Sequence, residues 1–319
     1  MILIVDGNNM AHRAKHSFSL SHNGVDVSVT YGFLRILLSM LNMFEVESVI
    51  VCWDGGIPEF RRKAVPEYKA NRHKDDDPLV YEDFVRQLQD LSDYVIPMLG
   101  MVSVILEGAE ADDLMYHASR LCRGESYIVS SDKDMLQAIN EYVKVYSPFK
   151  ETLYDADKVW DEYGVTLNNY IDWKAIQGDS SDNIPGIPGI GEKTATKLFK
   201  EYGTLTGITN AAMDRNPEAT MTGNMQNRIN SFGFDRIAKN IYVMALYADR
   251  VGARSAVLDA VYGWKPFDKT RVKKYFMSQA FVSLLDGAIY SRLGKLERPA
   301  IDIAGVRIPL VWRHDRVAA

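Results

Sequence analysis

The opening residues, Met1-Ile2-Leu3-Ile4-Val5-Asp6-Gly7-Asn8-Asn9, form a short apolar run that ends in an aspartate followed by a glycine. The pattern returns at residues 48–53, which precede Asp54-Gly55, and further apolar runs occupy 102–106, 127–129 and 143–146. Helical patterns separate these runs. This alternation is typical of a parallel sheet covered by helices. The sequence therefore predicts an α/β fold with a mostly parallel central sheet flanked by helices.

The overall composition fits a globular protein outside the membrane. The chain has 319 residues, 47% of them hydrophobic and 25% charged, and is long enough for more than one structural unit. Its start lacks the basic flank of a signal peptide, and its apolar runs are too short or too broken to span a bilayer. The only cysteines, Cys52 and Cys122, suggest a reduced compartment rather than a disulfide framework. We expect a cytoplasmic protein with no membrane partner.

A second region begins near Gln177. The Gly/Pro-rich segment 183–191 cannot form a regular helix or strand. Helical patterns dominate afterwards, for example at 192–202 and 271–285, and residues after about 298 carry little signal. The chain is therefore predicted to divide into residues 1–176 and 177–319.

Nine acidic residues stand out because most of them follow a predicted strand or begin a predicted helix. They are Asp6, Asp54, Glu110, Asp112, Asp113, Asp132, Asp134, Asp179 and Asp182. In open parallel sheets, ligands bind beyond the carboxyl ends of the strands. We therefore expect acids that are distant in sequence to meet at one edge of the sheet.

Carboxylates gathered in this way need a cation. Two of them about 4 Å apart repel by roughly 4 kcal/mol at an effective dielectric constant near 20. Such groups share protons or bind metal, and Mg²⁺ prefers hard oxygen ligands. Any single aspartate is more often a turn former or a helix N-cap, but the set of separated clusters favours two Mg²⁺ or Mn²⁺ ions.

The formal net charge of -5 argues only mildly against nucleic acid. Setting the nine acids aside leaves 33 of the 42 acidic residues against 37 lysines and arginines. A negative total can therefore conceal a positive face for DNA.

Six segments resemble the 5′-nuclease (flap endonuclease) family, which includes the 5′-3′ exonuclease domain of DNA polymerase I and free-standing bacteriophage 5′-nucleases. The resemblance covers about residues 1–250. The matching segments are Val5-Asp6-Gly7-Asn8-Asn9, Trp53-Asp54-Gly55, Phe60-Arg61 with Pro66-Glu67-Tyr68-Lys69-Ala70-Asn71-Arg72, Glu110-Ala111-Asp112-Asp113-Leu114, Ser131-Asp132-Lys133-Asp134, and the long run from Gly178 to Ala195. The last segment is the most specific.

The resemblance implies a PIN-like nuclease core with a helical arch at about 57–96, and a helical DNA-binding region with a helix-hairpin-helix at about 183–202. It also implies that all nine acids are metal-site carboxylates. One group would be Asp6, Asp54, Glu110 and Asp112, and the other Asp113, Asp132, Asp134, Asp179 and Asp182.

Residues 61–74 form the most basic stretch of the chain. In the family this stretch is the base of the arch, so Lys69 and Arg72 would face the scissile phosphate and act with Asp132 in catalysis. Arg61 and Arg62 would bind DNA, and Tyr68 would stack on a base. A solvated basic face is the simpler interpretation, but the position between Asp54 and Glu110 favours the arch.

The run 184–194 resembles a helix-hairpin-helix turn. Its glycines allow the backbone to approach phosphate, and the following helix offers free N–H groups at its N-terminus. The predicted DNA-binding residues here are Gly186, Gly189, Gly191, Lys193, Thr194 and Lys197. The family binds K⁺ at this turn, so K⁺ is expected as well. A packing turn without function is the alternative.

These features predict a metal-dependent, monomeric 5′-nuclease, encoded by a phage or a bacterium, that cuts DNA at single-strand/duplex junctions. The expected substrates are flap, nicked and pseudo-Y DNA and RNA/DNA primer junctions, in replication and repair. Since the chain stops at residue 319, we expect no polymerase domain. A PIN-type ribonuclease and a non-catalytic scaffold for branched DNA are the alternatives.

Three further interpretations concern single positions. Trp53 replaces a more usual phenylalanine, and Asp75-Asp76-Asp77 puts acids in an arch that is normally more neutral or basic. Neither departure touches the proposed metal site. Tyr242, Tyr247 and Trp264 are interpreted as core residues rather than base-stacking ones.

Overall fold

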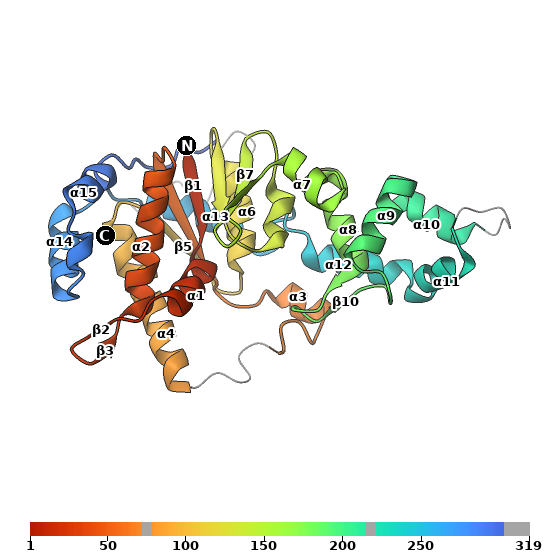
Figure 1. Cartoon of the computed structure of the whole chain (residues 1–319), viewed down its shortest axis with the longest axis horizontal. Coiled ribbons are helices and arrows are strands. Elements are labelled where there is room, and N and C mark those ends of the chain that lie inside the picture. The colour runs from red at the N-terminus through yellow and green to blue at the C-terminus, as the bar shows by residue number, and fades with distance from the viewer. Residues whose placement is uncertain (72–77, 215–220, 303–319) are drawn as a thin grey trace, which may run out of the picture.

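The computed structural model describes residues 1–71, 78–214 and 221–302. Its centre is a six-stranded sheet in the order β5-β4-β1-β6-β7-β8 (Figure 1). These strands are β1 (Ile2–Asp6), β4 (Ser48–Trp53), β5 (Val102–Ile105), β6 (Ser126–Val129), β7 (Val143–Ser147) and β8 (Thr152–Tyr154). All pairings are parallel except that of β8 with β7. The predicted mostly parallel sheet is confirmed, and the five predicted apolar runs lie in its parallel strands.

Helices cover both faces of the sheet, which explains why its strands are apolar on both sides. Along β1, Leu3 and Val5 pack with residues of α1 (Gly7–Ser17) and α2 (Ser28–Met43). Ile2 and Ile4 pack instead with residues of α6 (Ala111–Leu121). The alternation of side chains along a strand thus divides the core into two layers.

The carboxyl ends of β1, β4 and β6 lie next to one another. Asp6 pairs with Cys52 on β4, and Val5 pairs with Val129 at the end of β6. Residues that follow these three strands therefore begin at the same edge of the sheet.

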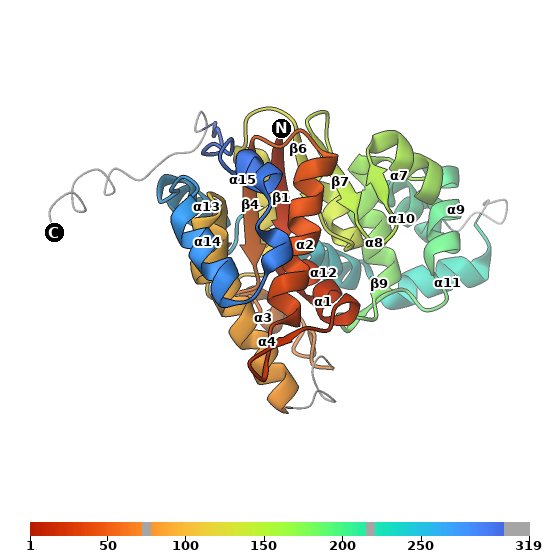
Figure 2. The same ribbon diagram turned by 60° about the vertical axis from the view of Figure 1, so that its left-hand side comes forward.

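The region between β4 and β5 is helical and projects beyond that edge (Figure 1). It contains α3 (Glu59–Ala64), α4 (Pro78–Asp90), a π-helical turn (Leu91–Val95) and α5 (Ile96–Met98). The arch predicted at about 57–96 would contain α3, α4 and the π-helical turn, and it stays a prediction. Figure 2 shows α3 and α4 below the sheet from a second direction.

After the sheet, a group of helices extends to one side of the molecule (Figures 1 and 2). They are α7 (Ala156–Tyr163), α8 (Tyr170–Gln177), α9 (Glu192–Tyr202), α10 (Leu205–Met213), α11 (Gly223–Phe232) and α12 (Phe234–Met244). The helix predicted at 192–202 is confirmed as α9. Two short hairpins are formed by β2 (Ser21–His22) with β3 (Val25–Asp26), and by β9 (Gly178–Asp179) with β10 (Ile184–Pro185). Single 3-10 turns occupy Lys133–Ala138, Leu167–Asn169 and Val282–Leu284.

The last described helices return to the core. Val257 and Val261 of α13 (Ala253–Tyr262) belong to the same buried cluster as α6, whereas Val272 and Phe276 of α14 (Lys269–Ser278) pack with the α1–α2 layer. Leu293 of α15 (Gly287–Leu293) joins that layer. The division at residues 176/177 stays a prediction, and the chain after residue 252 lies against the sheet-bearing part.

The helix predicted at 271–285 was wrong in its extent. Helix α14 ends at Ser278, where Ala280 adopts a positive φ of 55° that a right-handed helix cannot contain. A separate 3-10 turn then covers Val282–Leu284. Within the described residues, none of the helices combines the length and apolar character that a bilayer crossing requires.

Candidate active site

Asp6 and Asp54 lie at the ends of the neighbouring strands β1 and β4. The Oδ1 atom of Asp6 accepts a hydrogen bond from the Asn9 N–H (2.9 Å), which caps α1. Asp54 Oδ1 accepts one from the Ala111 N–H at the start of α6 (2.8 Å), while the side-chain oxygen of Asn8 accepts the Asp54 N–H (3.0 Å). Each carboxylate therefore faces a helix N-terminus, where the helix dipole favours negative charge.

Ser130 connects this pair to Asp132. Its hydroxyl donates to Asp6 Oδ2 (2.8 Å) and accepts a hydrogen bond from the Asp132 N–H (3.1 Å). Asp132 follows β6 and accepts the Asp134 N–H (2.8 Å). Asp112 lies in the first turn of α6. Four acids from four segments thus gather near one edge of the sheet.

Two of these four carboxyl groups, Asp6 and Asp112, have raised pKa values, and other members of the set contribute to the shifts. Burial, the charge of Asp54 and the charge of Asp132 together raise the pKa of Asp6 to about 7, although hydrogen bonds from Asn9 and Ser130 oppose the shift. The pKa of Asp112 is raised well above its usual range by burial, by Asp132 and by Asp6. Mutual repulsion of this kind is what a bound cation would relieve.

Arg61 on α3 is buried against two more of the predicted metal ligands. Its Nη1 donates to Glu110 Oε2 and to Asp113 Oδ2 (2.6 Å each), and its Nη2 donates to Asp113 Oδ1 (2.9 Å). Its Nε donates to the backbone carbonyl of Val243 (3.0 Å). Glu110 and Asp113 also cap each other's backbone at the start of α6. The guanidinium thus positions this capping pair.

Lys69 and Tyr68 hold Glu110 together with Asp182. The Lys69 ammonium is bonded to Glu110 and lies 3.8 Å from Asp182. The Tyr68 hydroxyl donates to Glu110 (3.0 Å) and to Asp182 (3.2 Å). Burial alone would lower the pKa of Lys69, but the charges of Glu110, Asp182 and Asp112 outweigh it and raise the pKa. Lys69 is therefore held as a cation beside the carboxylates.

A second lysine, Lys174 on α8, joins the remaining two acids. It pairs with Asp134 and lies 3.5 Å from Asp179. Burial of Asp179 tends to raise its pKa, but hydrogen bonds from Ser181 and the charge of Lys174 prevail and lower it. Sequence reasoning missed Lys174 and Ser130. Lys174 lies between Trp173 and Ala175 in a mostly apolar helix, and this unusual setting was the available signal.

The donor set fits divalent metal. Five of the nine acids, Glu110, Asp113, Asp134, Asp179 and Asp182, pair with Arg61, Lys69 or Lys174. Burial and neighbouring carboxylates raise the pKa of both Asp6 and Asp112. Along 1–71, 78–214 and 221–302, no three His, Cys, Asp or Glu side chains already stand at metal-binding spacing. Hard oxygen donors with unrelieved repulsion are nevertheless the chemistry that Mg²⁺ or Mn²⁺ requires.

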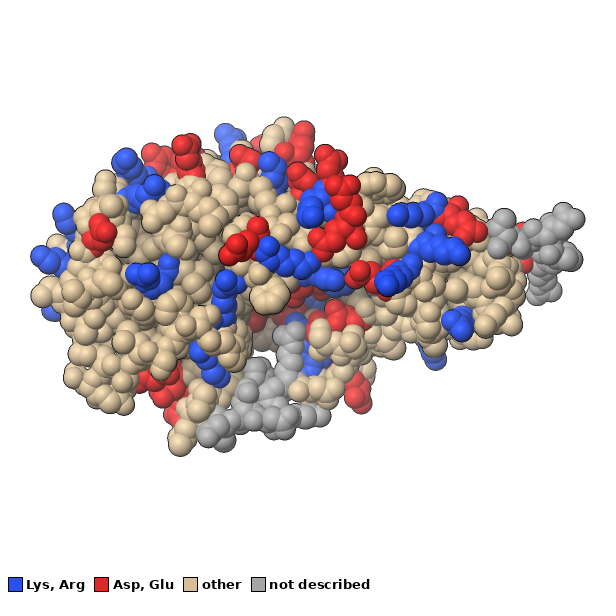
Figure 3. Space-filling model, viewed as in Figure 1, with Lys and Arg blue, Asp and Glu red and all other residues tan. Residues whose placement is uncertain are grey.

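Two of the nine acids, Asp54 and Glu110, border a cleft of about 580 Å³ between the sheet edge and α4. Asn8, Asp54, Lys69 and Glu110 line one side, and α4 contributes residues including Tyr81 and Val85 to the other. In Figure 3, acidic side chains occupy the hollow near the middle of the visible face, beside Lys and Arg side chains that extend toward the α9 end. The charged residues that line the cleft itself are the acids Asp54 and Glu110 and the cation Lys69.

Three predicted DNA contacts in the arch need correction or fall outside the structure. Arg61 is 3% exposed and Tyr68 is 6% exposed, so their burial among carboxylates does not support direct contact with a strand or stacking on a base. Arg62 is exposed and donates to the Ile57 carbonyl (3.1 Å). Arg72 and the acids Asp75-Asp76-Asp77 lie outside the described residues.

The predicted phosphate-binding turn connects the β9–β10 hairpin to α9. A Cβ at Gly186 would overlap the Gln177 carbonyl, and Gly189 has a φ of 76°, so both positions require glycine. Gly191 precedes α9 with open space around it. Lys193 and Lys197 are exposed on α9, and Thr194 is half-buried. The turn therefore leaves its backbone and two cations facing solvent.

The aromatic residues interpreted as core do not share one environment. Tyr242 and Tyr247 are 44% and 56% exposed, so that interpretation was wrong for both. Trp264 is half-buried, and its indole N–H donates to the Gly100 carbonyl (2.8 Å). Tyr242 directly precedes Val243 in the last turn of α12. The Val243 carbonyl accepts a hydrogen bond from Arg61, whereas the Tyr242 side chain remains at the surface.

Two family models match the chain in succession. The N-terminal resolvase-like domain of 5′-3′ exonucleases matches residues 1–164, and the C-terminal SAM fold of 5′-3′ exonucleases matches residues 165–241. Together they cover the sheet, the helical region between β4 and β5, and the helices as far as α12.

Curated relatives include bacterial DNA polymerases. The chain is 35% identical to the thermostable DNA polymerase I of Thermus aquaticus over 212 residues, which are 65% of this chain and 24% of the relative. It is 34% identical to DNA polymerase I of Mycobacterium tuberculosis over 218 residues, again 65% of this chain and 24% of the relative. The chain spans about a quarter of the length of the curated relatives that it matches.

Solved structures show the same fold. A flap endonuclease of bacteriophage T5, in a complex with DNA and metal ions, has a TM-score of 0.64 at 21% identity, with 88% of this chain and 98% of that chain covered. The catalytic core of Rad2 in complex with a DNA substrate has a TM-score of 0.52 at 17% identity, with 87% of each chain covered.

Proposed function

The chain belongs to the 5′-3′ exonuclease family, and from this premise we propose that it is a structure-specific 5′-nuclease. It would hydrolyse phosphodiesters of branched DNA near single-strand/duplex junctions, as a flap endonuclease and 5′-3′ exonuclease. The observation that carries the proposal is the meeting of Asp6, Asp54, Asp112 and Asp132 at one sheet edge, where their charges act on one another.

Asp6, Asp54, Asp112 and Asp132 would hold divalent metal, with Mg²⁺ or Mn²⁺ as the proposed ions. When bound, two such ions would activate water and stabilise the charge that develops on the phosphate oxygens. The carboxylates paired with Lys174, namely Asp134 and Asp179, would bind the second ion or orient its ligands. The positive charge of Lys174 balances these two acids in the absence of metal. A metal ion bound by the acids would take over that role, which supports the proposed second site.

The lysine at the base of the arch would act on the substrate. The Lys69 ammonium lies at the wall of the cleft, bonded to Glu110 and within reach of Asp112's charge. Fixed positive charge at this position would orient the scissile phosphate and stabilise its transition state. Tyr68 and Arg61 would support this geometry by positioning Glu110, Asp113 and Asp182.

The turn at 186–191 and helix α9 would hold the duplex. Backbone N–H groups at the start of α9, with Lys193 and Lys197, would contact phosphates and therefore bind without regard to base sequence. A K⁺ ion on the backbone carbonyls of this turn is part of the proposal. The single strand with the 5′ end would enter the cleft between the sheet edge and α4.

The proposed setting is replication and repair in the cytoplasm of a bacterium, from a phage or a bacterial gene, with the protein acting as a monomer. Flaps and RNA/DNA primer junctions would be the substrates. The family match and the DNA complexes of proteins with the same fold support DNA as the substrate class.

The test is the titration of Mg²⁺ against a labelled 5′-flap substrate, with a chelator as the control. We expect cleavage close to the junction, a 5′-phosphate on the product, and activity on flap substrates well above that on plain single strands. Flap binding without cleavage at any metal concentration would identify a scaffold. A preference for single-stranded RNA would identify a PIN-type ribonuclease.

A further inference from the structure

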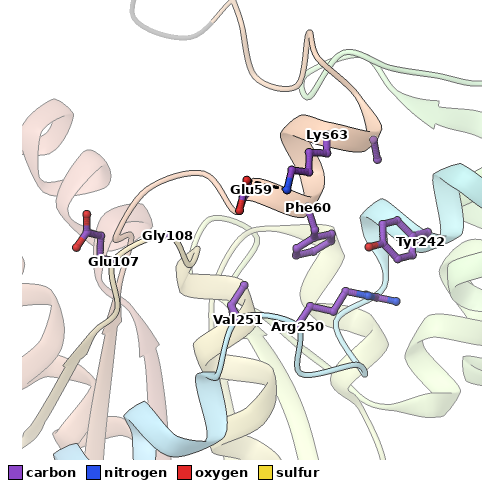
Figure 4. A pocket seen from close by; sticks show the side chains of 9 residues that line it. Glu59, Phe60, Lys63, Glu107, Gly108, Tyr242, Arg250 and Val251 are labelled. Carbon is purple, nitrogen blue, oxygen red and sulfur yellow. Dashed lines mark ion pairs between the residues drawn. The ribbon is translucent and has the colours of Figure 1, made fainter.

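A second cavity, of about 740 Å³, is lined in part by α3 and shares no lining residue with the active-site cleft. Its wall contains three flat side chains that point toward one another: Phe60 from α3, Tyr242 from α12, and Arg250 from the segment before α13 (Figure 4). The Arg250 guanidinium lies 4.4 Å from the Tyr242 ring centroid and 5.3 Å from that of Phe60. The Phe60 and Tyr242 rings meet edge to face at 5.6 Å.

This cluster is built as a platform rather than as a closed core. Tyr242 is 44% exposed, although it contacts both Phe60 and Arg250. Arg250 donates to the Ala245 carbonyl (3.3 Å), which fixes its position along the tyrosine ring. A planar cation held against an exposed aromatic ring is a surface on which a nucleobase stacks.

The charges of the cavity favour a base over a phosphate. Glu59 and Glu107 balance Lys63 and Arg250 among the lining residues, so an anionic backbone gains little inside. Lys63 is at the border, where its pair with Glu59 (2.8 Å) is exposed on both sides. Such a pair is weak and can be exchanged for a phosphate. The occupant that fits is a base inside and its backbone at the border.

The cavity also adjoins the cleft. Gly56 lines the cleft and Gly108 lines the cavity, and the Gly108 N–H donates to the carbonyl of Gly55 (2.8 Å), the residue before Gly56. Gly108 faces open space. Since Gly55, Gly56 and Gly108 carry no side chains, they present only backbone to a strand that crosses here.

We propose that the cavity around Phe60, Tyr242 and Arg250 binds one unstacked base of the 5′ single strand after that strand has passed the catalytic carboxylates. The site would anchor a flap a few nucleotides from the cut and would give longer flaps an additional affinity. This inference rests on the proposed 5′-nuclease function.

The experiment measures binding of 5′-flap DNA to the full chain in the absence of divalent metal. Substrates carry flaps of one to ten nucleotides, and in the longest flap a single abasic nucleotide is moved along the strand. Tyr242→Ala removes the ring, and Tyr242→Phe restores it without the hydroxyl. Tyr247→Ala is the matched control, because Tyr247 is also an exposed tyrosine near the end of α12 but does not line the cavity. Thermal melting verifies that each variant is folded.

With the wild-type chain, we expect affinity to rise about tenfold at one flap length and to fall by the same factor when the abasic nucleotide occupies one position, as loss of a single stacked base would cause. Tyr242→Ala should abolish both effects, whereas Tyr242→Phe and Tyr247→Ala should retain them. Equal affinity for all flap lengths, or an abasic effect that persists in Tyr242→Ala, overturns the proposal. Cleavage of short flaps by the wild-type chain in Mg²⁺ tests the proposed function separately, since the additional site is not needed there.

Discussion

At the scale of single residues, three cations determine the state of the site. Arg61, Lys69 and Lys174 neutralise five acids that would otherwise be buried and repel one another. Their roles differ because Arg61 is bonded by three nitrogens and held to the Val243 carbonyl, whereas each lysine offers a single ammonium group to its acids. Arg61 is therefore structural, and the lysines are the cations whose pairing metal or substrate would change.

Replacing Arg61 by alanine should destabilise the fold. The change leaves Glu110 and Asp113 buried without their partner, and removal of one member of a buried ion pair costs about 3–5 kcal/mol. Urea unfolding gives the free energy directly. Arg62→Ala is the control, because Arg62 is exposed on the same helix and a surface change of this kind alters stability by about 0.5 kcal/mol or less. Equal midpoints for the two variants would contradict the role of Arg61.

Asp132→Asn should abolish cleavage while leaving affinity for flap DNA within about tenfold of the wild type, since it removes a charge needed in the transition state. Asn also caps helical turns, so the bond to the Asp134 N–H is preserved and the local fold survives. Single-turnover cleavage and metal-free binding are the two measurements. An equal loss in both would remove Asp132 from the catalytic role.

Lys69→Ala should lower kcat by about a hundredfold and change KM less, because a fixed donor to the developing charge is worth that much. The backbone of Lys69 has a φ of 55° and donates to the Asp182 carbonyl (3.2 Å), so a side-chain deletion leaves an unusual conformation to be maintained. Circular dichroism therefore accompanies the kinetics. Unchanged kcat in a folded variant would place Lys69 outside the active site.

At the scale of secondary-structure elements, the β9–β10 hairpin and α9 form a turn that depends on close backbone approach. The Asn240 side chain on α12 donates to the carbonyls of Ala175 and Pro185 (2.8 Å each) and so fastens the hairpin to two helices. Gly186, the residue after Pro185, is packed against the Gln177 carbonyl, while Gly191 has open space around it. Gly186 is therefore needed for packing, whereas Gly191 is accessible to a ligand.

Gly186→Ala should lower the melting temperature and weaken binding to duplex DNA together, because its Cβ would overlap the Gln177 carbonyl. Gly191→Ala should leave the melting temperature unchanged, since its φ is -97° and no atom lies within 4 Å of the added carbon. Thermal unfolding and duplex affinity are measured for both. If Gly191→Ala melts as low as Gly186→Ala, the turn is not packed as described.

At the scale of the whole molecule, the sheet brings four distant segments to one edge. The helices after residue 252 return to pack on the two layers that cover the sheet. Burial and the charges of neighbouring acids raise the pKa values of Asp6 and Asp112, so the fold holds these acids near one another against repulsion. A ligand that relieves the repulsion must stabilise the folded state.

Addition of Mg²⁺ should therefore raise the unfolding free energy. At a concentration about 100 times the dissociation constant, the gain is about 2.7 kcal/mol for one site. Calorimetry of the wild type and of Asp132→Asn, each with Mg²⁺ and with chelator, measures it. The increase should be smaller in Asp132→Asn, and an identical increase in both would show that the stabilising ion binds elsewhere.

The sequence by itself determined the sheet strands, the acids that follow them and the glycine-rich turn. These features depend on local patterns: an apolar run, an aspartate at its end, and glycines where the backbone needs room. Strand order and parallel pairing then bring Asp6, Asp54 and Asp132 to a common edge, because parallel strands end on the same side of a sheet.

Only the tertiary structure decided which charges meet and which rings stay at the surface. The basic stretch at 61–69 reads as a surface for DNA, yet Arg61 binds a carbonyl 182 residues away and Tyr68 is buried against Asp182. Tyr242 reads as core but is exposed beside Arg250. Burial and ion pairing depend on packing between segments far apart in the chain, and a local pattern carries no information about that packing.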